Sequence, residues 1–228
     1  MDEVHVEYTE DRRRLLRMLR AETEEMMRPL HEAYIDAVVY GSIARGDVRE
    51  GSDIDIWITS SPSPTVVQAV LERRGARIRR REIIQATPSY AAKAYLYTEP
   101  DRGYSLPLVE LRASEAEFYR FAGSLGYPRL QTGTRVPGVD KRLMLIEPTE
   151  TGHRESTIQG REGRVAGLLG VDIKIVQERV RTLERRGKVG RTGVYIKRVL
   201  DDDEDFGAVF EDLVMSKPAL RRRMRQKR

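Results

Sequence analysis

The sequence predicts an α/β protein with a small mixed sheet, followed by a smaller C-terminal domain of two helices and a hairpin. Two short apolar segments, 37–40 and 53–58, are typical of buried strands separated by a polar turn. Apolar residues with helical spacing at 10–34 and 65–74 predict the helices that cover the sheet. A basic segment over 151–200 has its own helical and alternating periods. We therefore expect domains at 1–148 and 149–200, with a charged, mobile tail at 201–228.

Composition narrows the class of protein. Charged residues make up 34% of the chain and apolar residues 39%, and there is no Cys. The charged fraction exceeds the usual quarter, and the absence of Cys excludes disulfides and thiolate metal sites. The acidic start of the chain lacks a long apolar run, so we expect no signal peptide and no membrane partner. A cytoplasmic location fits these features.

The segment 37–46 reads as a strand, a tight turn and one helical turn. Ala37 to Tyr40 is the apolar strand, and Gly41-Ser42 follows it directly. Glycine lets the backbone turn tightly and expose its N–H groups, which can bind phosphate oxygens. Ile43 to Arg45 then begins a short helix that Gly46 closes.

The second strand carries a pair of carboxylates. Asp53 and Asp55 point the same way because side chains alternate along a strand, and Ile54, Ile56 and Ile58 fill the other side. Two adjacent carboxylates repel each other unless one is protonated or a cation lies between them. Mg²⁺ accepts one or two carboxylates together with substrate phosphates. The two strands therefore predict a nucleotide site.

Gly41-Ser42-Ile43-Ala44-Arg45-Gly46, followed by Ser52-Asp53-Ile54-Asp55, resembles the signature of the DNA polymerase β-like nucleotidyltransferase superfamily, of the small prokaryotic or archaeal type. The resemblance implies a nucleoside triphosphate, expected to be ATP, held by Gly41 and Ser42 with Arg45 and Ser52 beside it. It also implies two metal ions, Mg²⁺ with Mn²⁺ as an alternative, and a third carboxylate on a later strand.

Glu110, on a strand expected at 105–112, is the candidate for that third carboxylate, and a surface glutamate on an edge strand is the alternative. Strands are also expected at 77–85 and 141–147, a strand or a short helix running into one at 90–97, and a helix at 114–122. The basic run of Arg77 with Arg79 to Arg81 is either a solvated sheet edge or a substrate phosphate site. His153 lies beside Glu155, and we favour a structural role for it over acid-base or metal chemistry.

The basic segment 151–200 holds 12 Lys and Arg against 5 Asp and Glu. Helices at 161–169 and 173–186, a short turn between them and a hairpin at 188–199 resemble a winged helix-turn-helix. Its exposed polar residues are expected to bind nucleic acid: Lys174, Gln177, Arg181, Arg185 and Arg191. The alternative is a winged helix used for dimerisation or packing.

These features predict a metal-dependent nucleotidyltransferase in which Asp53, Asp55 and Glu110 are catalytic and bind metal. The acceptor hydroxyl is expected on a nucleic acid, either RNA such as tRNA or DNA. The alternatives are an adenylyltransferase acting on a protein or a small molecule, and a DNA-binding regulator that senses nucleotide without turnover. The oligomeric state stays open.

Overall fold

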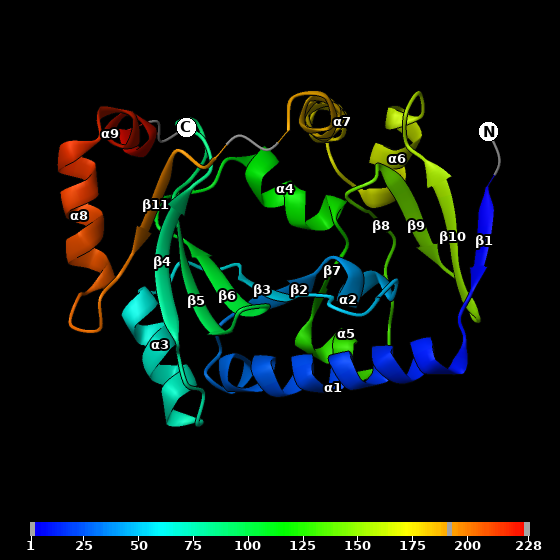
Figure 1. Ribbon diagram of the computed structural model, residues 1–228, viewed down its shortest axis with the longest axis horizontal. Coiled ribbons are helices and arrows are strands. Elements are labelled where there is room, and N and C mark those ends of the chain that lie inside the picture. Colours follow the sequence, from blue (N-terminus) through cyan, green and yellow to red (C-terminus); the bar gives the residue numbers. More distant parts are fainter. Residues whose placement is uncertain (1–2, 191–192, 226–228) are drawn as a thin grey trace. The chain divides into compact units, whose positions relative to one another are not determined.

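The structure is a computed structural model of the chain and describes residues 3–190 and 193–225. The chain forms two compact units (Figure 1). Unit 1 comprises Met1–Met26, Val38–Ile54 and Ala113–Thr192, and unit 2 comprises Met27–Ala37, Asp55–Arg112 and Gly193–Arg228. Helices and sheets alternate along the chain, so the α/β fold is confirmed.

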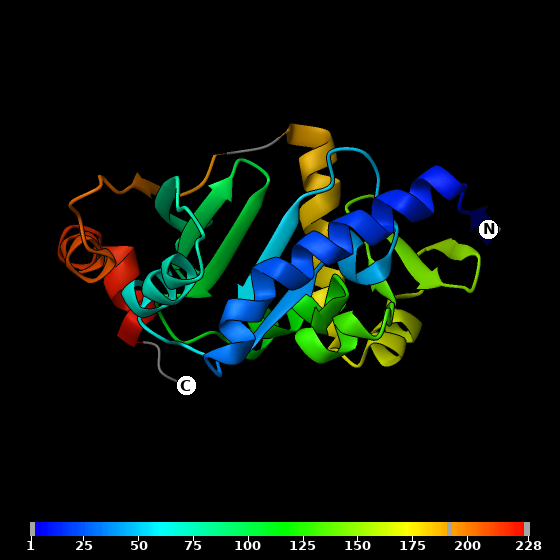
Figure 2. The same ribbon diagram turned by 90° about the horizontal axis from the view of Figure 1, so that it is seen from below.

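Unit 1 begins with a strand and a long helix. Its elements are β1 (Val4–Glu7), α1 (Glu10–Glu32, in unit 1 up to Met26), β2 (Ala37–Tyr40), α2 (Ser42–Arg45), α4 (Ala113–Phe121), β7 (Ser124–Gly126), α5 (Tyr127–Gln131), β8 (Gly138–Val139), β9 (Met144–Pro148), β10 (Gly152–Thr157), α6 (Glu162–Leu169) and α7 (Ile173–Val189). A four-stranded antiparallel sheet has the order β1-β10-β9-β8, and β2 pairs with β7. Figure 2 shows α1 as one long helix running past α2.

Unit 2 is built on a meander of antiparallel strands. Its elements are β3 (Ile54–Ile58), α3 (Pro64–Arg73), β4 (Arg80–Gln85), β5 (Lys93–Glu99), β6 (Arg102–Pro107), β11 (Ile196–Val199), α8 (Phe206–Ser216) and α9 (Pro218–Arg225). The strand order in this unit is β11-β4-β5-β6-β3. Ile83, Leu96 and Leu106 have no exposed surface and form the core on one side of the sheet.

The expected domain boundary near Pro148 is a turn inside one sheet. β9 and β10 pair with each other across it, from His153 with Pro148 to Thr157 with Met144. α6 and α7 share a core with the preceding strands, in which Val139, Leu145, Val165 and Val176 are buried together. The helices α6 and α7 therefore do not form a lobe of their own. Their apolar faces cover residues of unit 1 that would otherwise be exposed to water.

The hairpin expected at 188–199 is wrong. Lys188 and Val189 continue α7, which ends at Gly190, where φ is 82°. Ile196–Val199 instead pairs antiparallel with β4, from Ile196 with Gln85 to Val199 with Glu82. An edge strand offers unpaired backbone groups, and here a distant segment of the chain pairs with them. The two helices of the predicted winged helix-turn-helix are present, whereas the described residues of 188–199 form no hairpin.

The charged tail expected to be mobile forms helices over its described part. Asp205 caps α8 by accepting hydrogen bonds from the N–H groups of Gly207 and Ala208. Phe206, Val209 and Phe210 are buried, and so is Leu220 in α9. The acidic run 201–205 leads into α8, and the described basic residues lie within α9; both helices pack through apolar residues. Of the helices in the described part, none is long and apolar enough to cross a membrane.

Candidate active site

The turn after β2 provides the space that a phosphate group needs. Gly41 has φ 81° and ψ −143°, a conformation that essentially only glycine adopts. Its N–H donates to the carbonyl of Gly123 at 2.9 Å, which fixes the turn against the segment after α4. A Cβ atom built on Gly41 would meet no heavy atom within 4 Å. An incoming group can therefore approach the backbone closely here.

A buried arginine of α1 supports the short helix α2. Arg20 is 7% exposed, and its guanidinium donates to the carbonyl of Ile43 at 3.2 and 3.1 Å and to that of Ala44 at 3.2 Å. Burial is the main cause that lowers the pKa of Arg20 to about 10, so the side chain still carries its charge near neutral pH. Arg20 was not predicted, since an arginine in an amphipathic helix reads as a surface residue.

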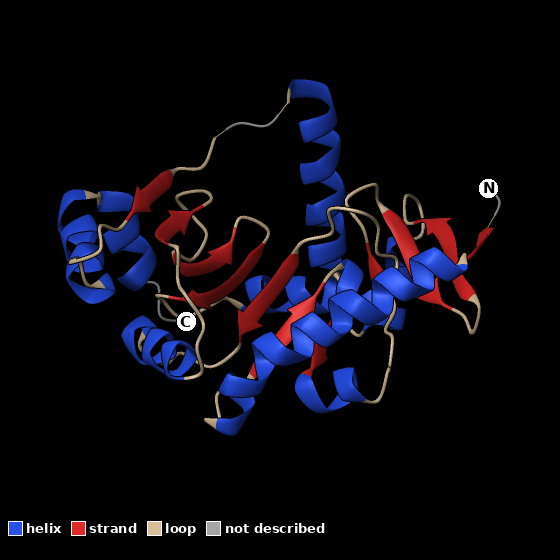
Figure 3. Cartoon of the chain, turned by 60° about the horizontal axis from the view of Figure 1, so that its bottom comes forward, coloured by secondary structure: helices blue, strands red, loops and turns tan. Residues whose placement is uncertain are grey.

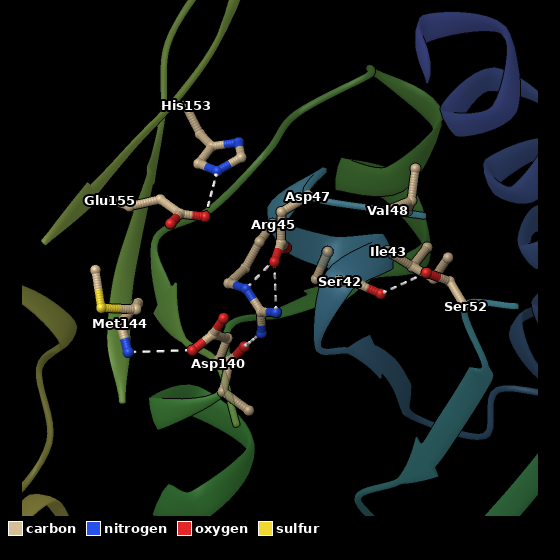
Figure 4. A network of polar contacts seen from close by, with 12 residues as sticks. Ser42, Ile43, Arg45, Asp47, Val48, Ser52, Asp140, Met144, His153 and Glu155 are labelled. Atoms are coloured by element: carbon tan, nitrogen blue, oxygen red, sulfur yellow. Dashed lines mark hydrogen bonds and ion pairs between the residues drawn. The ribbon is translucent and has the colours of Figure 1, made fainter. Parts of the chain in front are cut away.

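Arg45 does not face a phosphate site, contrary to the prediction. Its Nε and Nη2 donate to Asp47 Oδ1 and Oδ2, both at 3.0 Å, and its Nη1 donates to the carbonyl of Ala122 at 2.6 Å (Figure 4). The side chains of Arg45 and Asp47 are only 6% and 10% exposed. With these donors engaged inside unit 1, Arg45 holds the turn in place. Asp47 was missed because it has no motif of its own.

Ser42 and Ser52, which were both predicted to bind the nucleotide, contact each other. The Ser42 hydroxyl donates to Ser52 Oγ at 3.4 Å, and Ser52 Oγ also accepts from the N–H of Arg49 at 3.0 Å. These bonds tie the loop before β3 to the start of α2 (Figure 4). Two predicted residues thus meet although ten positions separate them.

β3 has the alternation that the sequence predicts. Ile54, Ile56 and Ile58 have no exposed surface. Asp53 directly precedes the strand and is exposed, whereas Asp55 is half-buried. Trp57, two residues after Asp55 and so on the same side of the strand, has the Nζ of Lys93 at 5.0 Å from its ring centroid. The carboxylates therefore lie on the side of β3 opposite the isoleucine core.

Glu110 is not on a strand. β6 ends at Pro107, and Glu110 is exposed, with its carbonyl accepting a hydrogen bond from Arg223 Nη2 at 2.9 Å. The expected strand 105–112 is wrong because β6 starts three residues earlier and pairs with β5 only from Arg102 to Pro107. In residues 3–190 and 193–225, no three His, Asp or Glu side chains lie together as a metal site. The role of Glu110 as third carboxylate stays a prediction.

The expected nucleic-acid contacts lie along one helix. Lys174, Gln177, Arg181 and Arg185 are all exposed on α7, at spacings of three and four residues that place them on one side of the helix. Figure 3 shows the C-terminal half of α7 projecting from unit 1. Arg191 lies outside the described residues.

His153 belongs to a buried hydrogen-bond network. It is 1% exposed, with its Nδ1 2.8 Å from the Tyr8 hydroxyl and its Nε2 3.0 Å from Glu155 Oε1. Glu155 also accepts from Arg142 at 2.6 Å. A carboxylate accepts, so Nε2 of His153 carries a proton and donates to Glu155. The network joins β1 to β10 and is consistent with the structural role favoured for His153.

The comparisons with known proteins agree with this geometry. Residues 20–96, about a third of the chain, match the family model described as nucleotidyltransferase domain. Neither the curated proteins nor the solved structures gave a match. The matched region contains the Gly41-Ser42 turn and both aspartates of the β3 segment. It supports the resemblance to the DNA polymerase β-like superfamily, and the chain is an enzyme whose general activity is the transfer of a nucleoside monophosphate.

Proposed function

We propose that the protein transfers a nucleoside monophosphate from a nucleoside triphosphate, with ATP as the expected donor, to a hydroxyl of a nucleic acid. The main observation in support of this activity is that the Gly41-Ser42 turn and the two carboxylates follow each other in this order within the matched region. An open turn at Gly41 is joined through the Ser42–Ser52 contact to the loop that ends at Asp53. A triphosphate needs close backbone approach and a cation, and the two halves of this segment supply the ligands for both.

The residues at β3 fit a hard divalent cation. Asp53 is exposed and Asp55 is half-buried on the side of the strand away from the core. Their oxygen donors suit Mg²⁺, with Mn²⁺ as an alternative, and Mg²⁺ takes its other ligands from substrate phosphates and water. Asp53 and Asp55 would hold up to two such ions, and Glu110 is the proposed third carboxylate. When bound, the metal lowers the pKa of the attacking hydroxyl and stabilises the leaving oxygens.

The reaction is a displacement at the α-phosphorus. The acceptor oxygen forms a bond to phosphorus, the bond to the pyrophosphate oxygen breaks, and the hydroxyl proton passes to solvent. Ser42 would donate to a phosphate oxygen, and the backbone at Gly41 would leave room for it. To do so, the Ser42 hydroxyl would turn away from Ser52 Oγ, to which it donates at 3.4 Å in this structure.

The acceptor is argued from charge. The segment 151–200 has seven more Lys and Arg than Asp and Glu, and four exposed polar residues follow one side of α7. Such a row suits the phosphates of a polyanion. A protein or small-molecule hydroxyl needs no such surface.

The test is incubation of the full chain with labelled ATP and Mg²⁺ in separate mixtures with total RNA, DNA or protein from cells. We expect label in RNA or DNA, and no label with an Asp53→Asn variant that retains the wild-type melting temperature. Label confined to protein would replace the proposed acceptor. Absence of ATP binding by calorimetry would contradict the proposed function as a whole.

A further inference from the structure

The basic run before and within β4 separates into side chains with different partners. Arg79 forms an ion pair with Glu99 at 2.9 Å. Arg81 donates to the carbonyl of Glu204 at 2.9 Å and holds the segment before α8. Arg80, between them, points to the other side of the strand. The guanidinium of Arg80 lies over the ring of Tyr97.

Strand register identifies the neighbours of Arg80. It pairs with Tyr97 on β5, and Glu82 pairs with Tyr95. Directly opposed residues of antiparallel strands share a face of the sheet. The guanidinium carbon of Arg80 is 4.3 Å from the centroid of the Tyr97 ring, and the Tyr95 and Tyr97 rings are stacked with centroids 5.9 Å apart. We call these four residues, with Lys197, the tyrosine face.

The tyrosine face lies on the same side of the sheet as Asp55, one of the two candidate metal-binding carboxylates. Lys93 pairs with Ile84 and shares the side of β5 with Tyr95, and Lys93 contacts Trp57, which shares the side of β3 with Asp55. Burial is the largest cause that raises the pKa of Tyr95, and the charges of Asp55 and Glu82 add to it. Both observations place Asp55 on the tyrosine face of unit 2.

The Tyr97 ring leans toward β3. On β6, the strand between β5 and β3, the residue opposite Tyr97 is Gly103. A Cβ atom on Gly103 would lie 2.8 Å from Tyr97 Cδ1, so the ring occupies the space that a side chain would take. Tyr95 and Tyr97 are both half-buried, and the residues opposite them on β6 are small: Ser105 and Gly103.

A buried carboxylate anchors the cations. The Glu82 side chain is 2% exposed and lies 3.3 Å from both Arg80 Nε and Lys197 Nζ. The two cationic side chains are 44% and 55% exposed, so their outer N–H groups reach solvent. One negative charge against two positive ones leaves this end of the face cationic.

We propose that the tyrosine face binds the single-stranded end of the acceptor nucleic acid, with a base stacked on Tyr97 in the place that the Arg80 guanidinium occupies in this structure, and a phosphate at Lys197 and the displaced Arg80. This rests on the proposed function and names the acceptor subsite for it. Aromatic rings stack any base, and exposed cations follow the backbone. Three strand spacings of about 4.8 Å separate β3 from β4, so the face spans about 14 Å. A stacked strand advances about 3.4 Å per nucleotide, which allows about four nucleotides between Asp55 and Arg80.

The experiment measures binding of eight-nucleotide single strands, one of RNA and one of DNA, by fluorescence anisotropy without ATP. Each strand carries 2-aminopurine near its 3′ end, whose emission falls when it stacks. For Tyr97→Leu and Arg80→Gln we expect affinity to fall about tenfold. Quenching should be lost in Tyr97→Leu and retained in Tyr97→Phe, which keeps the ring. Arg77→Gln removes an exposed charge of the same basic run and should match the wild type.

The outcomes separate this proposal from the proposed function. Wild-type affinity and quenching in both Tyr97→Leu and Arg80→Gln, with melting temperatures unchanged, would overturn the tyrosine face as a subsite while ATP binding still supports nucleotidyl transfer. The proposal would also be overturned if the two variants lost as much affinity for a blunt duplex as for the single strands. The internal bases of a duplex are paired and cannot stack on Tyr97. Should Tyr97→Leu unfold, Arg80→Gln still decides, since its side chain is exposed. The RNA and DNA strands show which acceptor the face prefers.

Discussion

Arg45 and Asp47 form a two-point ion pair inside unit 1, with Nε–Oδ1 and Nη2–Oδ2 distances of 3.0 Å each. A third guanidinium nitrogen donates to the carbonyl of Ala122. Together these bonds connect α2 to the end of α4. The chain turns at Gly41, just before α2, and at Gly123, just after α4. The positive charge that the motif places next to the nucleotide turn therefore stabilises the turn itself.

Replacing Arg45 should reduce stability before it changes nucleotide affinity. Arg45→Met leaves the Asp47 carboxylate poorly solvated and unpaired, and we expect a loss of about 3–5 kcal/mol in the free energy of unfolding. Chemical denaturation measures this, and Arg49→Met, at an exposed position in the following loop, should change it by less than about 0.5 kcal/mol. If the Arg45→Met protein is stable but binds ATP weakly, the result would instead support a role for Arg45 in phosphate binding.

The turn prediction concerns Gly41. A Gly41→Ala substitution strains the backbone and places a Cβ where a phosphate would approach, so ATP affinity should fall about tenfold or more. Gly133 is the matched control, because its φ of 71° is also left-handed and its Cβ would likewise meet nothing within 4 Å. Gly133→Ala should share the loss of stability and keep ATP binding. Equal ATP affinity in the two variants, measured by calorimetry, would exclude the turn as the phosphate site.

The carboxylate prediction concerns Asp53 and Asp55. Conversion of either to Asn should lower turnover by at least about 100-fold, because a metal that stabilises charge in the transition state contributes several kcal/mol. The melting temperature should hold or rise, since removal of one charge relieves repulsion between neighbours. Glu50→Gln, at an exposed position before the strand, is the control. Retained turnover in Asp55→Asn would rule out this site.

The pH prediction concerns Glu155. Burial pushes its pKa up, but hydrogen bonds from Arg142 and His153 and their charges outweigh burial and hold the pKa below its ordinary value of 4.5. A lowered folded-state pKa gives stability that is present above pH 4.5 and is lost as the pH falls through the folded-state value. Glu155→Gln should therefore cost about 1–2 kcal/mol at pH 7, and the cost should shrink below pH 4.5.

The control for that experiment is Glu150→Gln, an exposed glutamate on the turn between β9 and β10. Its stability should follow the wild type across the whole pH range. A constant difference between Glu155→Gln and wild type from pH 7 to pH 3 would mean that the carboxylate charge adds nothing to the network.

The α7 prediction concerns salt. Neutralising Lys174, Arg181 and Arg185 together should weaken nucleic-acid binding and reduce the log–log salt slope by about two to three, at 0.7–0.9 per phosphate contact. A control triple variant at exposed cations elsewhere in unit 1 uses Arg129, Lys141 and Arg164. Equal slopes in the two triple variants would mean that α7 does not contact phosphates. ATP affinity should be unchanged in both.

Local chemistry was enough to predict the segment from β2 to β3. The strand 37–40, the turn at Gly41 and the alternation of aspartate with isoleucine in β3 follow from neighbours two to four residues apart. The helices α6 and α7 were also predicted, but not which side of each faces the core: Leu168 and Ile173 are 43% and 41% exposed, while Ile175 is buried. A one-residue error in helical phase moves a side chain by 100°, and only the packed partner determines that phase.

The tertiary structure decided what depends on distant segments. Whether residues 196–199 form a hairpin or an edge strand depends on β4, more than 100 positions earlier in the chain. Whether Arg45 faces a phosphate or a carboxylate depends on Asp47 and on Ala122 being close in the fold. The direction of Arg80 depends on the register of β4 with β5. Periodicity along a sequence indicates which residues share a face of a helix or strand. Pairing between strands and burial of charges depend on which distant segments meet, and the local sequence pattern does not specify those contacts.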